Sequence, residues 1–165
     1  MVISIPEQSL ELQKQGIVLA RYPVSTAKNG PGEEFGSECT PRGRHVIRAK
    51  IGTDSEAGTV FVGRRSTGEV YSAELAQMAP DRDWILSRIL WLSGLEKGFN
   101  RLANVDTMRR YIYIHGTPYE NDIGKPVSHG CIRMRNTDLI ELYDNVVAGT
   151  VVTINAENPT QLPGK

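Results

Sequence analysis

Two short stretches of the chain place a cysteine and two histidines where they could act together. The letters "SHGC" end at Cys131 and put His129 and Gly130 directly before it, and "YIYIH" ends an apolar run at His115. A cysteine becomes a strong nucleophile when a neighbouring imidazole takes its proton or stabilises its thiolate. Cys131 is therefore a candidate nucleophile, with either histidine as the candidate base.

The glycine beside the cysteine adds a second feature of acyl-transfer chemistry. Gly130 lets the backbone approach a substrate closely, and backbone N–H groups at such a turn can stabilise a developing oxyanion. His115 ends a strand-like run, and strand ends hold side chains rigidly at a cleft. The two stretches together favour a site for cysteine-dependent catalysis.

Two other interpretations of these residues stay open on spacing alone. Cys131 could be a small buried hydrophobic residue, with the histidines hydrogen-bonded as part of the structure. Alternatively, His115, His129 and Cys131 could bind zinc, with water as the fourth ligand. No H-E-x-x-H or C-x-x-C pattern in the sequence supports this metal site.

The composition narrows the class of protein. The chain has 165 residues, which fits one domain, residues 1–165, that is large enough to bury a core. Hydrophobic residues make up 39% and charged residues 23%, as in a soluble globular protein. Lysine plus arginine and aspartate plus glutamate number 19 each, which argues against a nucleic-acid binder. Two cysteines are too few for a disulfide framework, and no stretch reaches the roughly 18 apolar residues of a membrane-spanning helix.

The first twenty residues do not resemble a signal peptide. They have no basic start, and Glu7, Glu11 and Lys14 interrupt any apolar segment. If Met1 is the native start, we expect a cytoplasmic protein.

Most of the chain has the pattern of β-strands. Alternation and turn residues predict a hairpin over 10–24, a loop over 28–43, and strands over 44–52, 59–63, 83–94 and 109–116. In the last of these strands, Ile112 and Ile114 face one side, and Tyr111, Tyr113 and His115 face the other. The catalytic histidine would then share its face with two tyrosines.

The best helix follows the cysteine. Asn136 or Thr137 is the expected N-cap and Gly149 the expected end. Five apolar residues at helical spacing form its buried stripe: Leu139, Ile140, Tyr143, Val146 and Val147. A strand over 150–154 and a loose polar tail over 155–165 complete the chain, and pattern alone predicts a β-rich protein with some helix.

The stretch "HGTPYENDIGKPVSHGCIRMRNTD", residues 115–138, resembles the catalytic signature of the L,D-transpeptidase (YkuD-type) family, a histidine followed by Ser/Thr-His-Gly-Cys. The segments "YPVSTAKNG" and "TPRGRHVI" are also similar to that family, so the resemblance covers a core of about residues 8–154. It implies a mostly β fold, sandwich-like or barrel-like, with a helix after the catalytic loop. It implies no cofactor.

The resemblance also implies roles for individual residues. Cys131 would be the nucleophile, His115 the general base, and the carbonyl of Gly116 would orient the imidazole. The N–H groups of Cys131, Gly130 and His129 would form the oxyanion hole, and Ser128 and His129 would line the cleft.

Several neighbouring residues carry weaker expectations. Arg133 stands where some family members carry asparagine, and it could bind a substrate carboxylate or brace the loop through backbone carbonyls. Tyr113 and Tyr111 could floor the cleft or simply form an exposed strand face. Other arginines are more consistent with solvated surface charge than with substrate attraction: Arg42, Arg44 and Arg135. Cys39 is expected to be a bystander thiol.

Family members cut the bond between the L-centre of a diamino acid, usually meso-diaminopimelate, and the following D-amino acid of a murein stem peptide. The expected absence of export favours a cytoplasmic L,D-carboxypeptidase of bacterial murein recycling that removes D-Ala from murein tetrapeptides, free or linked to sugar or nucleotide. A periplasmic L,D-transpeptidase that forms 3-3 cross-links or exchanges D-amino acids is the first alternative, and an inactive murein-binding module the second. The resemblance further implies covalent inhibition by carbapenems.

Overall fold

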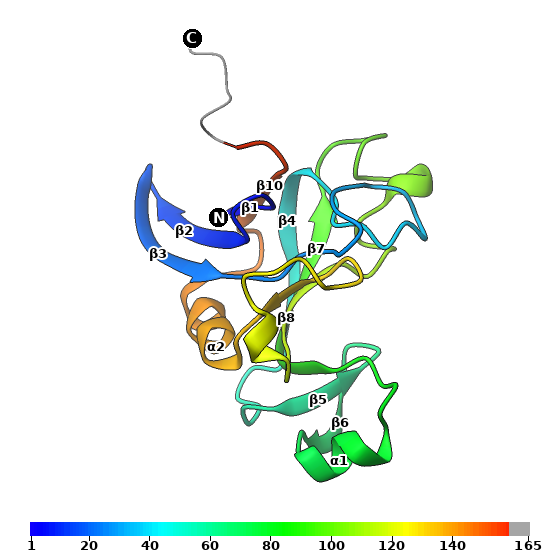
Figure 1. Cartoon of the computed structure of the whole chain (residues 1–165). Coiled ribbons are helices and arrows are strands. Elements are labelled where there is room, and N and C mark those ends of the chain that lie inside the picture. The colour runs from blue at the N-terminus through cyan, green and yellow to red at the C-terminus, as the bar shows by residue number, and fades with distance from the viewer. Residues whose placement is uncertain (159–165) are drawn as a thin grey trace.

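The computed structural model describes residues 1–158, which form a mostly β fold (Figure 1). Its strands and helices are β1 (Val2–Ser4), β2 (Ser9–Lys14), β3 (Ile17–Pro23), β4 (Gly43–Ile51), β5 (Thr59–Val62), β6 (Arg65–Val70), α1 (Ala73–Met78), β7 (Ile85–Gly94), β8 (Tyr113–Gly116), β9 (Ile132–Met134), α2 (Asn136–Asn145) and β10 (Val151–Asn155). Two short 3-10 turns lie at Ala103–Val105 and Glu120–Asp122. Most of the tail predicted to be loose, residues 159–165, lies outside the described residues. The predicted mostly β fold with a helix after the catalytic loop is confirmed.

The strands form one mixed sheet in the order β3-β2-β1-β10-β4-β7-β5-β6. Outside this order, β8 pairs with β7, and β9 pairs with β8. β7 is the ten-residue strand at its centre, and it pairs with β4, β5 and β8. The sequence predicted this segment as a strand, and that prediction is confirmed. β8 and β9 run parallel, and this pairing determines where the candidate catalytic residues lie.

The predicted hairpin near the N-terminus is confirmed as β2 and β3. Gln15 and Gly16 connect the strands, and both have positive φ angles, 51° and 77°. Such a two-residue turn matches the twist of the strands that flank it. β1 was not predicted, because three residues are too short for a pattern, although Ile3 is fully buried.

The main core lies between α2 and the sheet. Leu139, Leu142, Tyr143 and Val146 pack from the helix against apolar side chains of the strands. The predicted apolar stripe was wrong at Val147, which is exposed, because α2 ends at Asn145 and not at Gly149. The helix is also not capped as predicted, since Asn136 is its first residue.

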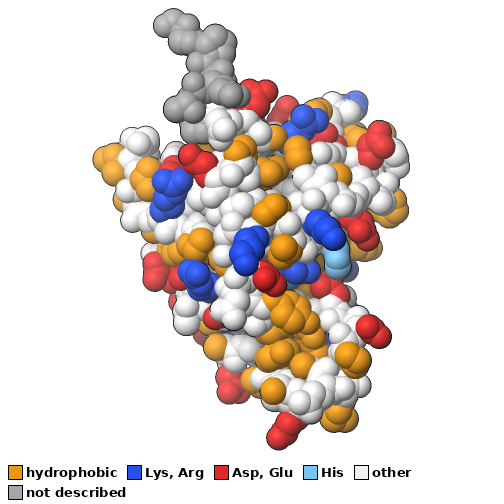
Figure 2. All heavy atoms as spheres, in the orientation of Figure 1, with side chains coloured by type: hydrophobic (Ala, Val, Ile, Leu, Met, Phe, Trp, Pro, Cys, Tyr) orange, Lys and Arg blue, Asp and Glu red, His pale blue; other side chains and the backbone are white. Residues whose placement is uncertain are grey.

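A small lobe of β5, β6 and α1 projects from the end of β7, at the bottom of Figure 1. The buried side chain of Trp84 packs edge-on against Tyr71 and anchors α1 to the sheet. Hydrophobic side chains gather on the surface of this lobe in Figure 2. α1 and β6 were not predicted, because one has six residues and the other has no apolar alternation.

Strand β8 is shorter than predicted. Tyr111 has a φ of 55°, which is not extended, so the predicted strand over 109–116 is interrupted there and β8 begins at Tyr113. Within residues 1–158, none of the helices has the length and apolar character needed to cross a bilayer.

Candidate active site

The parallel pairing of β8 with β9 brings the two sequence stretches together. His115 lies in register with Arg133, and Ile114 lies in register with Ile132. Because side chains alternate along a strand, Tyr113 and His115 share one face of the pair with Cys131 and Arg133. The alternate residues Ile114, Ile132 and Met134 enter the core beneath α2. The predicted nucleophile and base therefore meet on one side of the sheet.

A pocket of about 190 Å³ opens on this face. Its walls are formed by Asp83, Arg110, Tyr111, Ile112, His115, His129, Cys131 and Arg133. Sequence reasoning named five of these residues as site candidates or cleft residues, and it missed Asp83 and Arg110. Asp83 lies far from the motif in sequence, and Arg110 lies within the predicted strand over 109–116 but carries no motif of its own, so no local pattern marked either of them.

His115 is buried and is held in one orientation. Its Nδ1 lies 2.7 Å from the carbonyl oxygen of Gly116, as predicted for the orienting contact. A carbonyl only accepts, so Nδ1 carries the proton and Nε2 keeps its lone pair. Burial lowers the pKa of His115 to about 4, so the imidazole is neutral at neutral pH. A neutral imidazole with a free lone pair is the form that can accept a proton.

Cys131 lies against the backbone that leads into β8. Its Sγ accepts a hydrogen bond from the Tyr113 N–H at 3.3 Å and donates to the Tyr111 carbonyl at 3.4 Å. Burial raises the pKa of the Cys131 thiol to about 11, so the resting group is the thiol. Among the hydrogen bonds within residues 1–158, none joins this sulfur to His115, so the thiol must rotate before it transfers its proton. Catalytic contacts that are long in the free enzyme often tighten when substrate binds.

Gly116 allows a close approach behind the histidine. A Cβ atom there would lie 2.6 Å from the Leu86 carbonyl oxygen and would collide with the side chain of Asn136. Asn136 accepts a hydrogen bond from Ser87 and donates to the Thr117 carbonyl. The asparagine that the sequence suggested as a helix cap instead fixes the end of β8.

The Ser-His-Gly-Cys loop is braced from within. Ser128 is buried, and its hydroxyl donates to the Cys131 carbonyl at 2.6 Å and accepts from the Gly130 N–H at 3.3 Å. Gly130 has a φ of 127°, a conformation that favours glycine, and its carbonyl accepts a hydrogen bond from Thr40. Ser128 therefore holds the loop and does not line the pocket, and the Gly130 N–H predicted for the oxyanion hole already has a partner. His129 is exposed at the pocket wall.

The arginines of the site do two different things. Arg133 is mostly buried, with 12% of its side chain exposed, and its guanidinium lies 3.8 Å from the Asp83 carboxylate. Arg110 donates to the carbonyls of Gly32 and Cys39 and so ties the long loop to the pocket. The side chain of Arg133 faces the pocket with a loose ion pair, as a group that binds an anion would.

The other predicted residues lie around the pocket or away from it. Tyr113 is buried and does not line the pocket, and its hydroxyl accepts a hydrogen bond from Arg64 at 2.9 Å. Tyr111 is 54% exposed and lines the pocket. Cys39 and Cys131 are both free thiols. The arginines expected to be remote from the substrate have other neighbours: Arg42 pairs with Glu33, and Arg135 lies 4.0 Å from Asp138.

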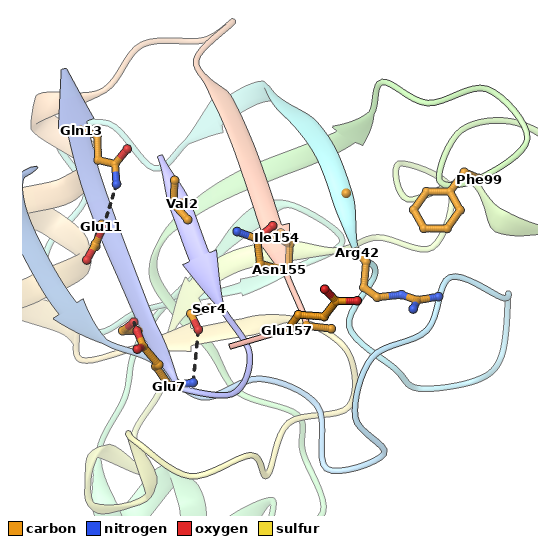
Figure 3. A pocket seen from close by; sticks show the side chains of 13 residues that line it. Val2, Ser4, Glu7, Glu11, Gln13, Arg42, Phe99, Ile154, Asn155 and Glu157 are labelled. Carbon is orange, nitrogen blue, oxygen red and sulfur yellow. Dashed lines mark hydrogen bonds between the residues drawn. The ribbon is translucent and has the colours of Figure 1, made fainter. Parts of the chain in front are cut away.

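A larger pocket, of about 530 Å³, lies elsewhere, over β1, β2 and the end of β10 (Figure 3). Its walls carry Glu7, Glu11, Glu157 and Arg42, with the Glu7 N–H bonded to the Ser4 hydroxyl. The described residues that line it include no cysteine or histidine. The smaller pocket is therefore the candidate active site, because it contains both the predicted nucleophile Cys131 and the predicted base His115.

The described part of the chain contains no set of ligands for the zinc site that the sequence leaves open as an alternative. Within residues 1–158, no three histidine, cysteine or acidic side chains gather closely enough to hold a metal ion. His115, His129 and Cys131 line one pocket without forming such a group.

Comparison with known proteins agrees with this arrangement. YkuD of Bacillus subtilis, named as an L,D-transpeptidase, is 55% identical over 47 residues, which is 28% of this chain and 29% of that protein. ErfK/SrfK of Escherichia coli, of the same naming, is 53% identical over 45 residues, or 27% of this chain and 14% of that one. These matches span less than a third of either relative's length.

Solved structures share the fold. An L,D-transpeptidase from Mycobacterium smegmatis superposes with a TM-score of 0.57 at 22% identity, covering 94% of this chain and 57% of that one. The L,D-transpeptidase LdtMt1, solved in complex with imipenem, gives a TM-score of 0.55 at 20% identity, with 93% and 57% coverage. This chain thus spans a little over half the length of those proteins.

The family model described as the L,D-transpeptidase catalytic domain, YkuD, matches residues 1–154, which include both β8 and the Ser-His-Gly-Cys loop. The chain therefore belongs to the YkuD family of L,D-transpeptidase catalytic domains.

Proposed function

We propose that the protein is a cysteine peptidase that acts on the L,D-peptide bond between the diamino acid and D-Ala of murein stem peptides. The observation that carries this proposal is the pairing on one sheet face of Cys131 with a neutral His115, whose Nδ1 is fixed by the Gly116 carbonyl. Family membership supports the class of substrate.

The first step would form a thioester. The thiol rotates toward His115, Nε2 accepts its proton, and the sulfur attacks the carbonyl carbon of the diamino acid. Because the Gly130 N–H is bonded to Ser128, we assign the oxyanion to the N–H groups of Cys131 and His129. The C–N bond then breaks, and the protonated Nε2 returns its proton to the leaving amine of D-Ala.

The second step would resolve the thioester with water. Nε2 takes a proton from water, the hydroxide attacks the thioester carbonyl, and the thiol leaves with the proton. Water is small enough to reach the thioester in a pocket of about 190 Å³ while the acyl group occupies it, and this access supports hydrolysis. We accordingly propose an L,D-carboxypeptidase that trims tetrapeptides to tripeptides.

We place this activity in the cytoplasm, where murein recycling supplies soluble tetrapeptides. The two free thiols support a reducing compartment. Cell fractionation with an antibody against the protein tests this placement, and recovery in the periplasmic fraction would contradict it.

Transfer to an amine is the second candidate, because the matched relatives are named as transpeptidases. In that case, the amine of a second stem or of a D-amino acid would replace water. The imipenem complex of LdtMt1 also supports covalent capture of Cys131 by a carbapenem in this chain.

One assay tests hydrolysis against transfer. Purified murein tetrapeptide is incubated with the protein, with and without a labelled D-amino acid, and the products are identified by mass spectrometry. The proposal predicts tripeptide and D-Ala, with little exchanged tetrapeptide. Exchange as the main product would establish the transferase instead, and an absence of any product would remove the peptidase proposal.

A further inference from the structure

Asp83 is an acidic side chain in the catalytic pocket for which the mechanism above has no use. It comes from the segment between α1 and β7, and 65% of its side chain is exposed. The next residue, Trp84, is buried and packed against Tyr71, so the backbone that carries Asp83 is anchored. A charged group is thus held at the pocket wall beside Arg133.

The charge pair is not built to ionise the thiol. Asp83 raises the pKa of Cys131 and Arg133 lowers it, so the two charges oppose each other at the sulfur. The pair is also loose: the 3.8 Å between Arg133 Nη2 and Asp83 Oδ1 exceeds a good charge-assisted hydrogen bond. Because the contact is long and the Asp83 side chain is 65% exposed, the pair holds neither charge tightly, and both stay available to a ligand.

The spacing from the nucleophile matches the proposed substrate. Arg133 lies two residues beyond Cys131, which directly precedes β9, and two residues of extended backbone span about 6.6 Å. In meso-diaminopimelate, five carbon–carbon bonds separate the attacked carbonyl from the distal stereocentre, about 6 Å when extended. That distal centre carries an ammonium and a carboxylate on one carbon, and an antiparallel pair of opposite charges is its electrostatic complement.

We propose that Arg133 and Asp83 together recognise the distal zwitterion of the diamino acid, with the guanidinium on its carboxylate and the Asp83 carboxylate on its ammonium. This inference rests on the proposed function and adds the specificity of the same pocket. Asp83 then selects stem peptides whose diamino acid has a free distal amine.

Three tetrapeptides test this proposal: one with unmodified meso-diaminopimelate, one with the distal amine acetylated and one with the distal carboxylate amidated. For the unaltered protein we expect kcat/KM to fall about 10-fold or more on acetylation and on amidation, as for loss of a charged contact. Asp83→Asn should lower kcat/KM for the unmodified peptide by a similar factor. It should abolish the response to acetylation and keep the response to amidation.

Asp81→Asn is the matched control, since Asp81 is an exposed acid two residues away that does not line the pocket. It should leave all three rates unchanged. An Asp83→Asn protein that still prefers the free amine would overturn the proposal, as would equal cleavage of the acetylated and unmodified peptides by the unaltered protein.

If the unaltered protein cleaves none of the peptides, the proposed function fails. The role of Asp83 is then tested separately by measuring how tightly the peptides bind. Calorimetry with Cys131→Ala should then show tighter binding of the unmodified than of the acetylated peptide. That difference should vanish in Cys131→Ala combined with Asp83→Asn, and its persistence would overturn the assignment of Asp83.

Discussion

The part of the chain that the structure describes contains two buried histidines in nearly the same electrostatic state, and one of them borders the pocket of Cys131, the proposed nucleophile. His45, in β4, and His115, in β8, are both almost inaccessible, and burial lowers the pKa of each to about 4. Each places Nδ1 near a glycine carbonyl, Gly43 at 3.0 Å and Gly116 at 2.7 Å. Up to this point, the two sites are alike.

The difference lies at the second ring nitrogen. His45 Nε2 lies 3.0 Å from the Thr107 hydroxyl, so both nitrogens are used inside the protein. His115 borders the pocket that contains Cys131, and the hydrogen bonds within residues 1–158 give its Nε2 no partner. Burial and a low pKa therefore do not by themselves distinguish a candidate base, whereas a fixed ring with one nitrogen open to a pocket does.

Substituting each histidine by glutamine gives the largest expected contrast. His115→Gln removes the proton acceptor and should lower kcat for tetrapeptide cleavage by about 10²–10⁴-fold. His45→Gln should leave kcat nearly unchanged and lower the free energy of unfolding by about 1–3 kcal/mol through lost buried hydrogen bonds. Steady-state kinetics and urea unfolding of both variants measure this, and equal losses of kcat would break the distinction.

Substitutions of the two glycines whose carbonyls contact the rings should differ in the same way, one lowering activity and the other only stability. In Gly116→Ala the new methyl group collides behind the catalytic ring, and we expect a cost of about 1–3 kcal/mol together with a clear loss of activity. Gly43→Ala is the control, because Gly43 has a φ of 90° and stands equally close to its neighbours. It should destabilise the fold and spare kcat of the folded fraction. A fully active, folded Gly116→Ala protein would show that the carbonyl contact is not needed.

The pH profile of kcat/KM reports the open histidine. Because the base must be neutral and its pKa is lowered to about 4, activity should stay level from pH 7 to about 5 and fall only as pH passes through 4. A fall in kcat/KM centred near pH 6.5, the ordinary pKa of histidine, would mean that the base is a solvated imidazole and not the buried one.

Both buried histidines make stability depend on pH, and the share of His45, which the variant His45→Gln isolates, is the smallest effect. His45 is protonated near pH 6.5 when unfolded but only near pH 4 when folded, so the unfolded state binds more protons between these values. Its contribution is present above pH 6.5 and is lost as pH falls toward 4, by roughly 3 kcal/mol at most. Urea unfolding at pH 7 and at pH 4.5 measures how much the free energy of unfolding falls between them. This fall should be smaller for His45→Gln than for the unaltered protein, and an identical fall would exclude His45 as its source.

The residues that local pattern could locate are those on the paired strands. Alternation placed His115 on one face of a strand, and the family signature named Cys131 as its partner. The sequence could not reveal that β9 would run parallel to β8, because Ile132–Met134 is only three residues long. That pairing is what sets Arg133 beside His115.

The missed residues reach the site through tertiary packing. Asp83 depends on the anchoring of Trp84, and Arg110 on the path of the loop it holds. Asn136 had a local interpretation as a cap, and its contacts with Ser87 and Thr117 override that preference. Each of these positions brings together segments that are distant in the chain, and no single-sequence pattern encodes such a meeting.

The identity of the acylated side chain tests most directly whether Cys131 is the nucleophile and His115 the base. The protein is mixed with tetrapeptide, quenched in acid within the first turnovers, and digested for mass mapping of the thioester. We predict the acyl group on the peptide that contains Cys131, in the unaltered protein and in His45→Gln, with little or none in His115→Gln. Acylation of Cys39, or equal acylation of Cys131 in His115→Gln, would contradict the assignment of nucleophile and base.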